Sequence, residues 1–210
     1  MEVNGYEIKP FAKMEGGNLS GANLSGANLF RAKMKGANLS GANLSGANLS
    51  QAKMKGANLS FTNLSNANLL DARLDGANLQ GAILTGANLT RARLDGANLQ
   101  GANLQGATMH ANLIRANLQG ANLSFTNLSN ACLNVVNLQD ANLQGANLYA
   151  ADLQRADLRG TNLSNANLNV ATLQGANLQG ANLQGAEMYG AKLGRANLTG
   201  AKMPDGTIHD

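Results

Sequence analysis

The chain has 210 residues, is 44% hydrophobic but only 3% aromatic, lacks tryptophan and carries a formal net charge of +4. Nearly all of its apolar mass is Ala and Leu, which excludes the bulky, varied core that normally surrounds a deep pocket. One cysteine, Cys132, excludes an intrachain disulfide, and no apolar run approaches the roughly 20 residues of a membrane span. The N-terminus also lacks the continuous apolar run of a signal peptide. We therefore expect a soluble, cytoplasmic protein with no membrane association.

The chain opens with residues 1–11, which do not follow the pattern of the rest. They bring Tyr6, Ile8, Pro10 and Phe11, enough apolar surface to cover one end of a repetitive structure. We expect this segment to be an N-terminal cap.

A five-residue frame, Ala-Asn-Leu-x-Gly, then runs from 12 to 106 and resumes from 111 to 205, always with Leu or Met at its centre. Gly in most units would cost a helix roughly 1 kcal/mol each, and collagen needs a period of three, so a helix and a collagen structure are both excluded. The frame instead fits a short strand that is bent at its end. Its first and third residues point to one face, its second and fourth to the other, and its fifth turns a corner.

Departures from the frame show how many such strands make one turn of the coil. Basic residues replace Asn at a spacing of twenty residues, which is four units, so each coil has four sides. The basic column comprises Lys13, Lys33, Lys53, Arg73 and Arg93. Nearly ten coils, stacked about 4.8 Å apart, predict a rod about 47 Å long.

The segment Ala107–His110 is one residue short of a full unit. The large residues that recur in the fourth position at a spacing of forty are separated by thirty-nine across it. This predicts that 107–110 still forms a whole side and lacks only its corner. The β-helix is thus expected to span 12–205 with a register break at 107–110.

The chain ends with residues 206–210. Pro204 cannot extend strand pairing, and Thr207 and Ile208 are placed to fold over the last coil. Both expected caps are short, so we expect a monomer or an end-to-end homodimer.

A frame of this kind, maintained through all thirty-nine centres between 12 and 205, is similar to that of the pentapeptide-repeat proteins. The N-terminal Val3–Ile8 and the C-terminal Ala201–Asp210 resemble the ends of cyanobacterial members. The resemblance implies an all-β fold, a right-handed quadrilateral parallel β-helix of about ten coils. Some members of the family mimic duplex DNA and bind gyrase, but those are strongly acidic, and here Asn far outnumbers Asp in the second position.

The basic column is the first candidate binding surface. Like charges about 5 Å apart repel, so an anionic neighbour would stabilise them. Asp75 and Asp95 are placed to neutralise the later cations and Glu15 the first, whereas Lys35 and Lys55 add charge. Two interpretations stay open, a solvated face that keeps the rod soluble and a contact patch for an acidic partner. Nucleic acid is not the expected partner, because aromatic platforms and denser basic charge are missing.

Two further sets of residues recur at a spacing of about forty. Large side chains form an aromatic edge in the fourth position, and arginines occupy the fifth position of another side. These are Phe30, Leu70, His110, Tyr149 and Tyr189, and Arg115, Arg155 and Arg195. The edge either covers neighbouring coils or contacts a protein partner.

No catalytic set, metal-ligand cluster or cofactor motif rises out of the repeat. His110 is a lone histidine, and Cys132 has no adjacent basic residue to activate it. We therefore expect no enzyme activity, no cofactor and no metal. The expected function is a non-catalytic protein-binding or structural scaffold with an unidentified protein partner, and the alternative is a DNA-mimicking inhibitor or protection factor of gyrase.

Overall fold

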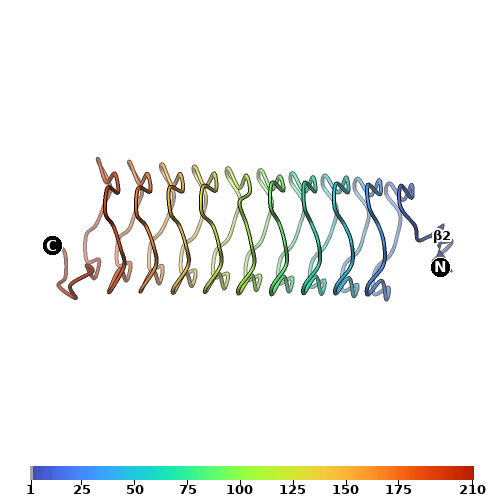
Figure 1. Cartoon of the computed structure of the whole chain (residues 1–210), viewed down its shortest axis with the longest axis horizontal. Coiled ribbons are helices and arrows are strands. Elements are labelled where there is room, and N and C mark those ends of the chain that lie inside the picture. Colours follow the sequence, from blue (N-terminus) through green and yellow to red (C-terminus); the bar gives the residue numbers. More distant parts are fainter. Residues whose placement is uncertain (1) are drawn as a thin grey trace.

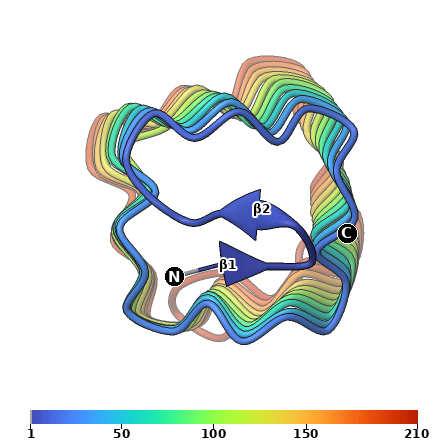
Figure 2. The same ribbon diagram turned by 90° about the vertical axis from the view of Figure 1, so that its right-hand side faces the viewer.

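The computed structural model describes residues 2–210, which form one long four-sided coil with the two termini at opposite ends (Figure 1). Viewed along its axis the coil is a square that winds in the right-handed sense (Figure 2). The predicted right-handed quadrilateral β-helix of about ten coils is confirmed.

Parallel β-bridges join second-position residues of successive coils, such as Asn38 to Asn58 and Asn58 to Asn78. The Leu39 N–H donates to the Asn58 carbonyl at 2.7 Å, and the Asn58 N–H donates to the Ala37 carbonyl at 2.9 Å. Each side of the square is therefore a very short strand that is paired with the coils before and after it. This pairing satisfies the main-chain polar groups, as a buried backbone requires.

Corners form because the fifth residue adopts a left-handed conformation. Gly41 has φ 65°, and the Ala42 N–H closes the turn by donating to the Leu39 carbonyl at 3.0 Å. Non-glycine residues take the same conformation where they occupy a corner, for example Arg31 (φ 55°) and Val135 (φ 58°). The corner conformation is thus imposed by the coil and not by glycine alone.

The core consists of two kinds of column, the first-position Ala and the central Leu or Met, almost all of them fully buried. Thr62, Thr126 and Thr161 replace Ala and are also buried. Their hydroxyls donate to main-chain carbonyls, as in Thr126 to Leu104 at 2.9 Å, so each of these three buried hydroxyls is satisfied. The interior is filled by small side chains.

At the short unit the chain turns more tightly than elsewhere. The Ala111 N–H donates to the Met109 carbonyl two residues back, at 2.7 Å, where other corners bridge three residues. Bridges across this point join Arg93 to Asn112 and Thr108 to Asn127, nineteen residues apart. All four sides keep their alignment through the break.

The N-terminal end is covered by a hairpin of β1 (Glu2–Val3) and β2 (Tyr6–Glu7), which pair antiparallel and lie across the mouth of the coil (Figure 2). Asn4 and Gly5, both with positive φ, form its turn. Ile8 is buried against the core, and the Tyr6 ring fills the space beside Gly17. Phe11 differs from our expectation, because it is a corner residue, 57% exposed, and does not cover the first coil.

The C-terminal tail does not fold over the last coil as expected. Ile208 pairs antiparallel with Lys202, which extends only the third side of the square, and its side chain is 61% exposed. Met188, Leu193 and Leu198 of the last coil remain only partly buried. The tail is used to pair along one side, which leaves the end of the core uncovered at the last coil.

Candidate interaction surface

The basic column lies on the first side of the square, and the structure brings its five members together. Bridges join Lys13 to Lys33, Lys33 to Lys53, Lys53 to Arg73 and Arg73 to Arg93. Their side chains point outward because the second position of the frame faces solvent, and all five are exposed. Bridged neighbours in adjacent strands lie about 5 Å apart, so the column is a continuous line of charge.

Acidic neighbours neutralise only the last member of this column. Arg93 pairs with Asp75 at 2.9 Å and with Asp95 at 3.8 Å. Glu15, which we expected to neutralise the first cation, has no ion pair within residues 2–210. Lys35 and Lys55 stand two residues beyond Lys33 and Lys53 on the same outer face and are also exposed.

The result is a patch of six exposed cations without an acidic partner among the described residues. We call it the basic face, and it comprises Lys13, Lys33, Lys35, Lys53, Lys55 and Arg73.

The side chains of Lys33, Lys53 and Arg73 form a ridge between two grooves. One groove, of about 360 Å³, lies on the Lys35 and Lys55 side of the ridge. The other, of about 460 Å³, lies between the ridge and the neighbouring corner. Both are open surface grooves lined mainly by cationic groups.

The corner beside the second groove carries Phe11 and Arg31, which sequence reasoning did not select. The Phe11 and Phe30 rings meet edge to face at 5.6 Å, and the Arg31 guanidinium lies 5.0 Å from the Phe30 ring centre. Arg31 Nε also donates to Gln51 Oε1 at 2.6 Å. The spacing of twenty residues between Phe11 and Arg31 was the available signal, but it begins inside the segment expected to be a cap.

The aromatic edge is less exposed than its sequence pattern suggested. Tyr149 and Tyr189 are exposed, by 46% and 86%, whereas Phe30, Leu70 and His110 are half-buried. His110 Nε2 lies 3.0 Å from Ser129 Oγ on the next coil. The first half of the edge therefore covers neighbouring coils, and only its C-terminal half is open.

The corner arginines lie on the corner after the first side, in coils that come later in the chain than the basic face. Arg115, Arg155 and Arg195 are all exposed. A groove of about 370 Å³ lies between Arg155 and Arg195, where Gly175 and Gly194 leave space. No acidic partner pairs with these arginines among residues 2–210.

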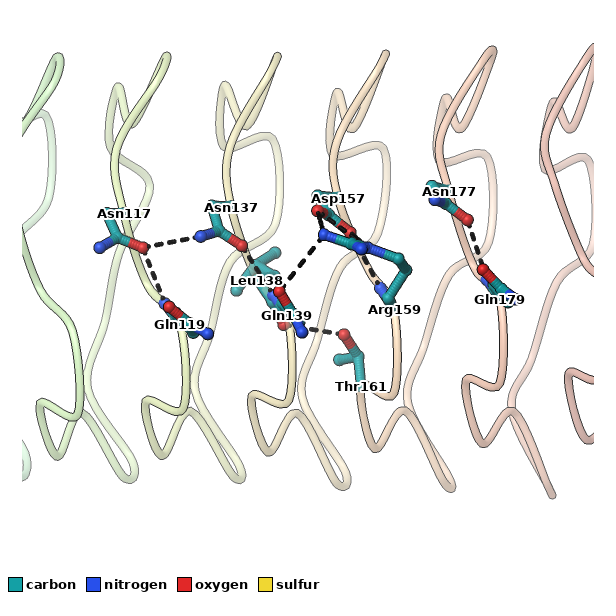
Figure 3. Close-up of polar contacts among 10 residues, drawn as sticks. All are labelled: Asn117, Gln119, Asn137, Leu138, Gln139, Asp157, Arg159, Thr161, Asn177 and Gln179. Atoms are coloured by element: carbon teal, nitrogen blue, oxygen red, sulfur yellow. Dashed lines mark hydrogen bonds and ion pairs between the residues drawn. The ribbon is translucent and has the colours of Figure 1, made fainter.

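The second side, in contrast, carries a ladder of asparagine amides (Figure 3). From Asn38 to Asn137 each amide Nδ2 donates to the Oδ1 of the preceding coil, as in Asn137 to Asn117 at 3.0 Å. Each Oδ1 along this stretch also accepts a main-chain N–H two residues on, as Asn117 does from Gln119. At Asp157 the ladder is interrupted, and Arg159 bonds to this carboxylate and to Gln139 on the preceding coil. The hydrogen bond from Arg159 lowers the pKa of Asp157. These residues satisfy one another, which indicates a structural role.

Residues 2–210 hold no group of three or more side chains suited to a metal ion. Within the same range, no helix is long and apolar enough to cross a membrane. Cys132 is exposed and free.

Comparisons with known proteins agree with this architecture. The family model described as pentapeptide repeats matches in eight copies between residues 11 and 203. The crystal structure of HetL, a pentapeptide repeat protein involved in heterocyst differentiation regulation from the cyanobacterium Nostoc sp. strain PCC 7120, is 37% identical. That match covers 97% of this chain and 93% of HetL, with a TM-score of 0.52.

The structure of QnrB1, a plasmid-mediated fluoroquinolone resistance protein, matches with 21% identity over 88% of this chain and 90% of that chain. Its TM-score of 0.65 shows a shared fold. No curated protein sequence matches this chain.

Proposed function

Because the chain belongs to the pentapeptide-repeat family, we propose that it is a non-catalytic scaffold that binds a protein partner laterally through the basic face. The observation that carries the proposal is the clustering of six exposed, unpaired cations on one side of a rod whose other sides present mainly asparagine. Two unit charges about 5 Å apart in water repel by about 0.8 kcal/mol. An anionic surface placed on this face removes that repulsion, which favours binding.

A solvated surface by itself does not account for the clustering. Solubility needs net charge, but it does not need the unpaired cations to gather on one side. The same side could hold its charges in balance, as it does at Arg93 between Asp75 and Asp95. The excess of unpaired charge in the first four coils is therefore the feature that favours a partner.

We further propose that the C-terminal coil supports end-to-end contact between two copies, with the monomer as the alternative. The main-chain N–H groups of Met188, Leu193 and Leu198 donate no hydrogen bond within residues 2–210, and their side chains are partly exposed. Open strand edges of this kind pair readily with another chain. Light scattering coupled to gel filtration distinguishes the dimer from the monomer.

We place the protein in the cytoplasm, and its single cysteine supports this location.

Charge reversal on the basic face tests the proposed function. We expect Lys33→Glu with Lys53→Glu to abolish the specific capture of partner proteins from a lysate of the source organism, measured by mass spectrometry. Lys192→Glu is the matched control, because Lys192 is exposed in the same column but in the last coil, away from the basic face.

The double variant should keep the β-type circular dichroism spectrum of the wild type, since both side chains point outward. Equal capture by the wild type and the double variant would contradict a role for this face.

A further inference from the structure

The groove between the ridge and the corner has two different walls. Lys33, Lys53 and Arg73 line one wall with three positive charges, and the corner residues of successive coils line the other. The main-chain N–H groups along this stretch are already bonded between coils, as in Arg31 to the Ser50 carbonyl at 3.0 Å. A ligand must therefore be recognised by side chains, and the groups that the ridge offers are charged donors.

The length of the groove limits the size of its occupant. Its corner wall runs from Phe11 to Asp71, which is three coil steps or about 14 Å. An extended polypeptide advances about 3.3 Å per residue, so about four residues fill this length.

The two ends of the groove differ in character. At one end Phe11 is 57% exposed and presents a ring to solvent. At the other end Asp71 accepts two hydrogen bonds from Arg91, at 2.7 and 2.8 Å, so this carboxylate is held in place and closes the positive stretch. The hydrogen bonding with Arg91 lowers the pKa of Asp71, which keeps it ionised. An occupant with several acids is attracted along the ridge and repelled beyond it.

We propose that this groove binds a short acidic segment of a partner protein, about four residues in extended form, with a large apolar side chain at the end that lies on Phe11. This inference rests on the proposed function and names the chemistry of the partner. Carboxylates spaced along the segment pair with Lys33, Lys53 and Arg73, and the apolar side chain covers the exposed ring.

Nucleic acid fits this groove less well. The unpaired charge ends after Arg73, because Arg93 is paired with two acids. Only one exposed aromatic ring lines the groove, whereas single-stranded nucleic acids bind successive aromatic platforms.

Fluorescence polarisation with short labelled probes tests the inference on the full chain. The main probe is a peptide of three glutamates followed by phenylalanine, and a second probe places the phenylalanine first. Matched probes replace the glutamates by glutamine or the phenylalanine by alanine. A labelled oligothymidylate of equal charge represents nucleic acid.

We expect the glutamate-phenylalanine probe to bind in a salt-dependent manner and the glutamine probe not to bind. Lys33→Gln with Lys53→Gln should raise the dissociation constant about tenfold or more, while Lys192→Gln leaves it unchanged. Phe11→Ala should weaken binding about threefold for probes with phenylalanine and have no effect on the alanine probe.

Equal binding of the glutamine probe, no effect of the double variant, or tighter binding of the oligothymidylate would overturn the inference. Loss of lysate capture in the Lys33→Glu, Lys53→Glu variant, together with no peptide binding, would leave the proposed function standing and refute only the acidic segment.

Discussion

At the scale of single residues, the second position of the frame decides whether a side is structural or open to a partner. Asparagine there accepts a main-chain N–H two residues on and donates to the preceding coil, as Asn58 does with Ser60 and Asn38. Lysine and arginine accept no hydrogen bond, so they cannot join such a ladder and extend into solvent. The basic column therefore consists of second-position residues that take no part in such a hydrogen-bonded ladder.

Val135 allows the energetic cost of the left-handed corner conformation to be tested at a single residue. This β-branched residue has φ 58° at an exposed corner, a conformation that costs L-residues about 1–2 kcal/mol. We expect Val135→Gly to raise the free energy of unfolding by about 1 kcal/mol, after the greater entropy of the unfolded glycine chain is deducted. Urea denaturation measures this change in the free energy of unfolding. Asn134→Gly, at the neighbouring position without a positive φ, should destabilise instead, and a stabilising effect there would contradict this explanation.

Asp157 gives the molecule a predictable response to acid. Hydrogen bonding from Arg159 lowers its pKa from the ordinary value of 3.8. The stability that this pair contributes is thus present above about pH 4 and is lost as the pH falls through the lower folded-state pKa. Both side chains are partly exposed, so we expect only about 0.5 kcal/mol. Melting curves between pH 5 and pH 2 should fall less steeply for Asp157→Asn than for the wild type, and parallel curves would exclude this source of pH dependence.

At the scale of the element, one side of one coil is stable only because its neighbours bury it. Each side contributes two inward side chains and forms its hydrogen bonds with other coils, so no side has a core of its own. Around the Leu columns the main-chain N–H groups already bond between coils, so a carboxylate placed there finds no free hydrogen-bond donor.

Leu99→Asp tests this dependence. Leu99 is completely buried, and a carboxylate in its place would lie in an apolar column without a hydrogen-bond donor. We expect a loss of about 4 kcal/mol or more, with increased hydrogen exchange concentrated in the coils on either side. Gln100→Asp, one residue further and exposed, is the control and should have almost no effect. Similar stability of the two variants would contradict the inward placement of Leu99.

At the scale of the whole molecule, charge is distributed along and around the rod in a way that argues against mimicry of DNA. A protein mimic of duplex DNA needs columns of acid, but the chain is basic overall at +4. Of the few acids in the second position, Asp157 is already paired with Arg159. The chain therefore lacks the columns of acid that mimicry of duplex DNA requires.

Gyrase assays check this directly. We expect DNA supercoiling by gyrase to be unchanged in the presence of excess protein, both with and without a fluoroquinolone. A reversed-charge variant carrying Lys33→Glu and Lys53→Glu controls for nonspecific effects of the basic face on DNA. Inhibition or drug protection by the wild type would favour the gyrase-binding alternative over the scaffold.

The sequence by itself determined the architecture of this protein, including the four-sided coil, the inward columns and the line of the basic residues. It could do so because every unit repeats the same local environment, so a strand period of two and a corner every fifth residue suffice to place each position. Even the register across 107–110 follows from the spacing of side chains on either side. The β-bridge between Arg93 and Asn112 keeps that alignment.

Only the tertiary structure decided which side chains meet. It paired Arg93 with Asp75 and left Glu15 without an ion pair in the described chain, although both acids hold equivalent positions in the frame. It placed Arg31 over Phe30 and left part of the aromatic edge half-buried. It also laid the C-terminal tail along one side of the square. Contacts of long side chains depend on rotamers and on neighbours twenty residues away. A repeat places the backbone atoms of those neighbours, but it does not choose among the conformations of their side chains.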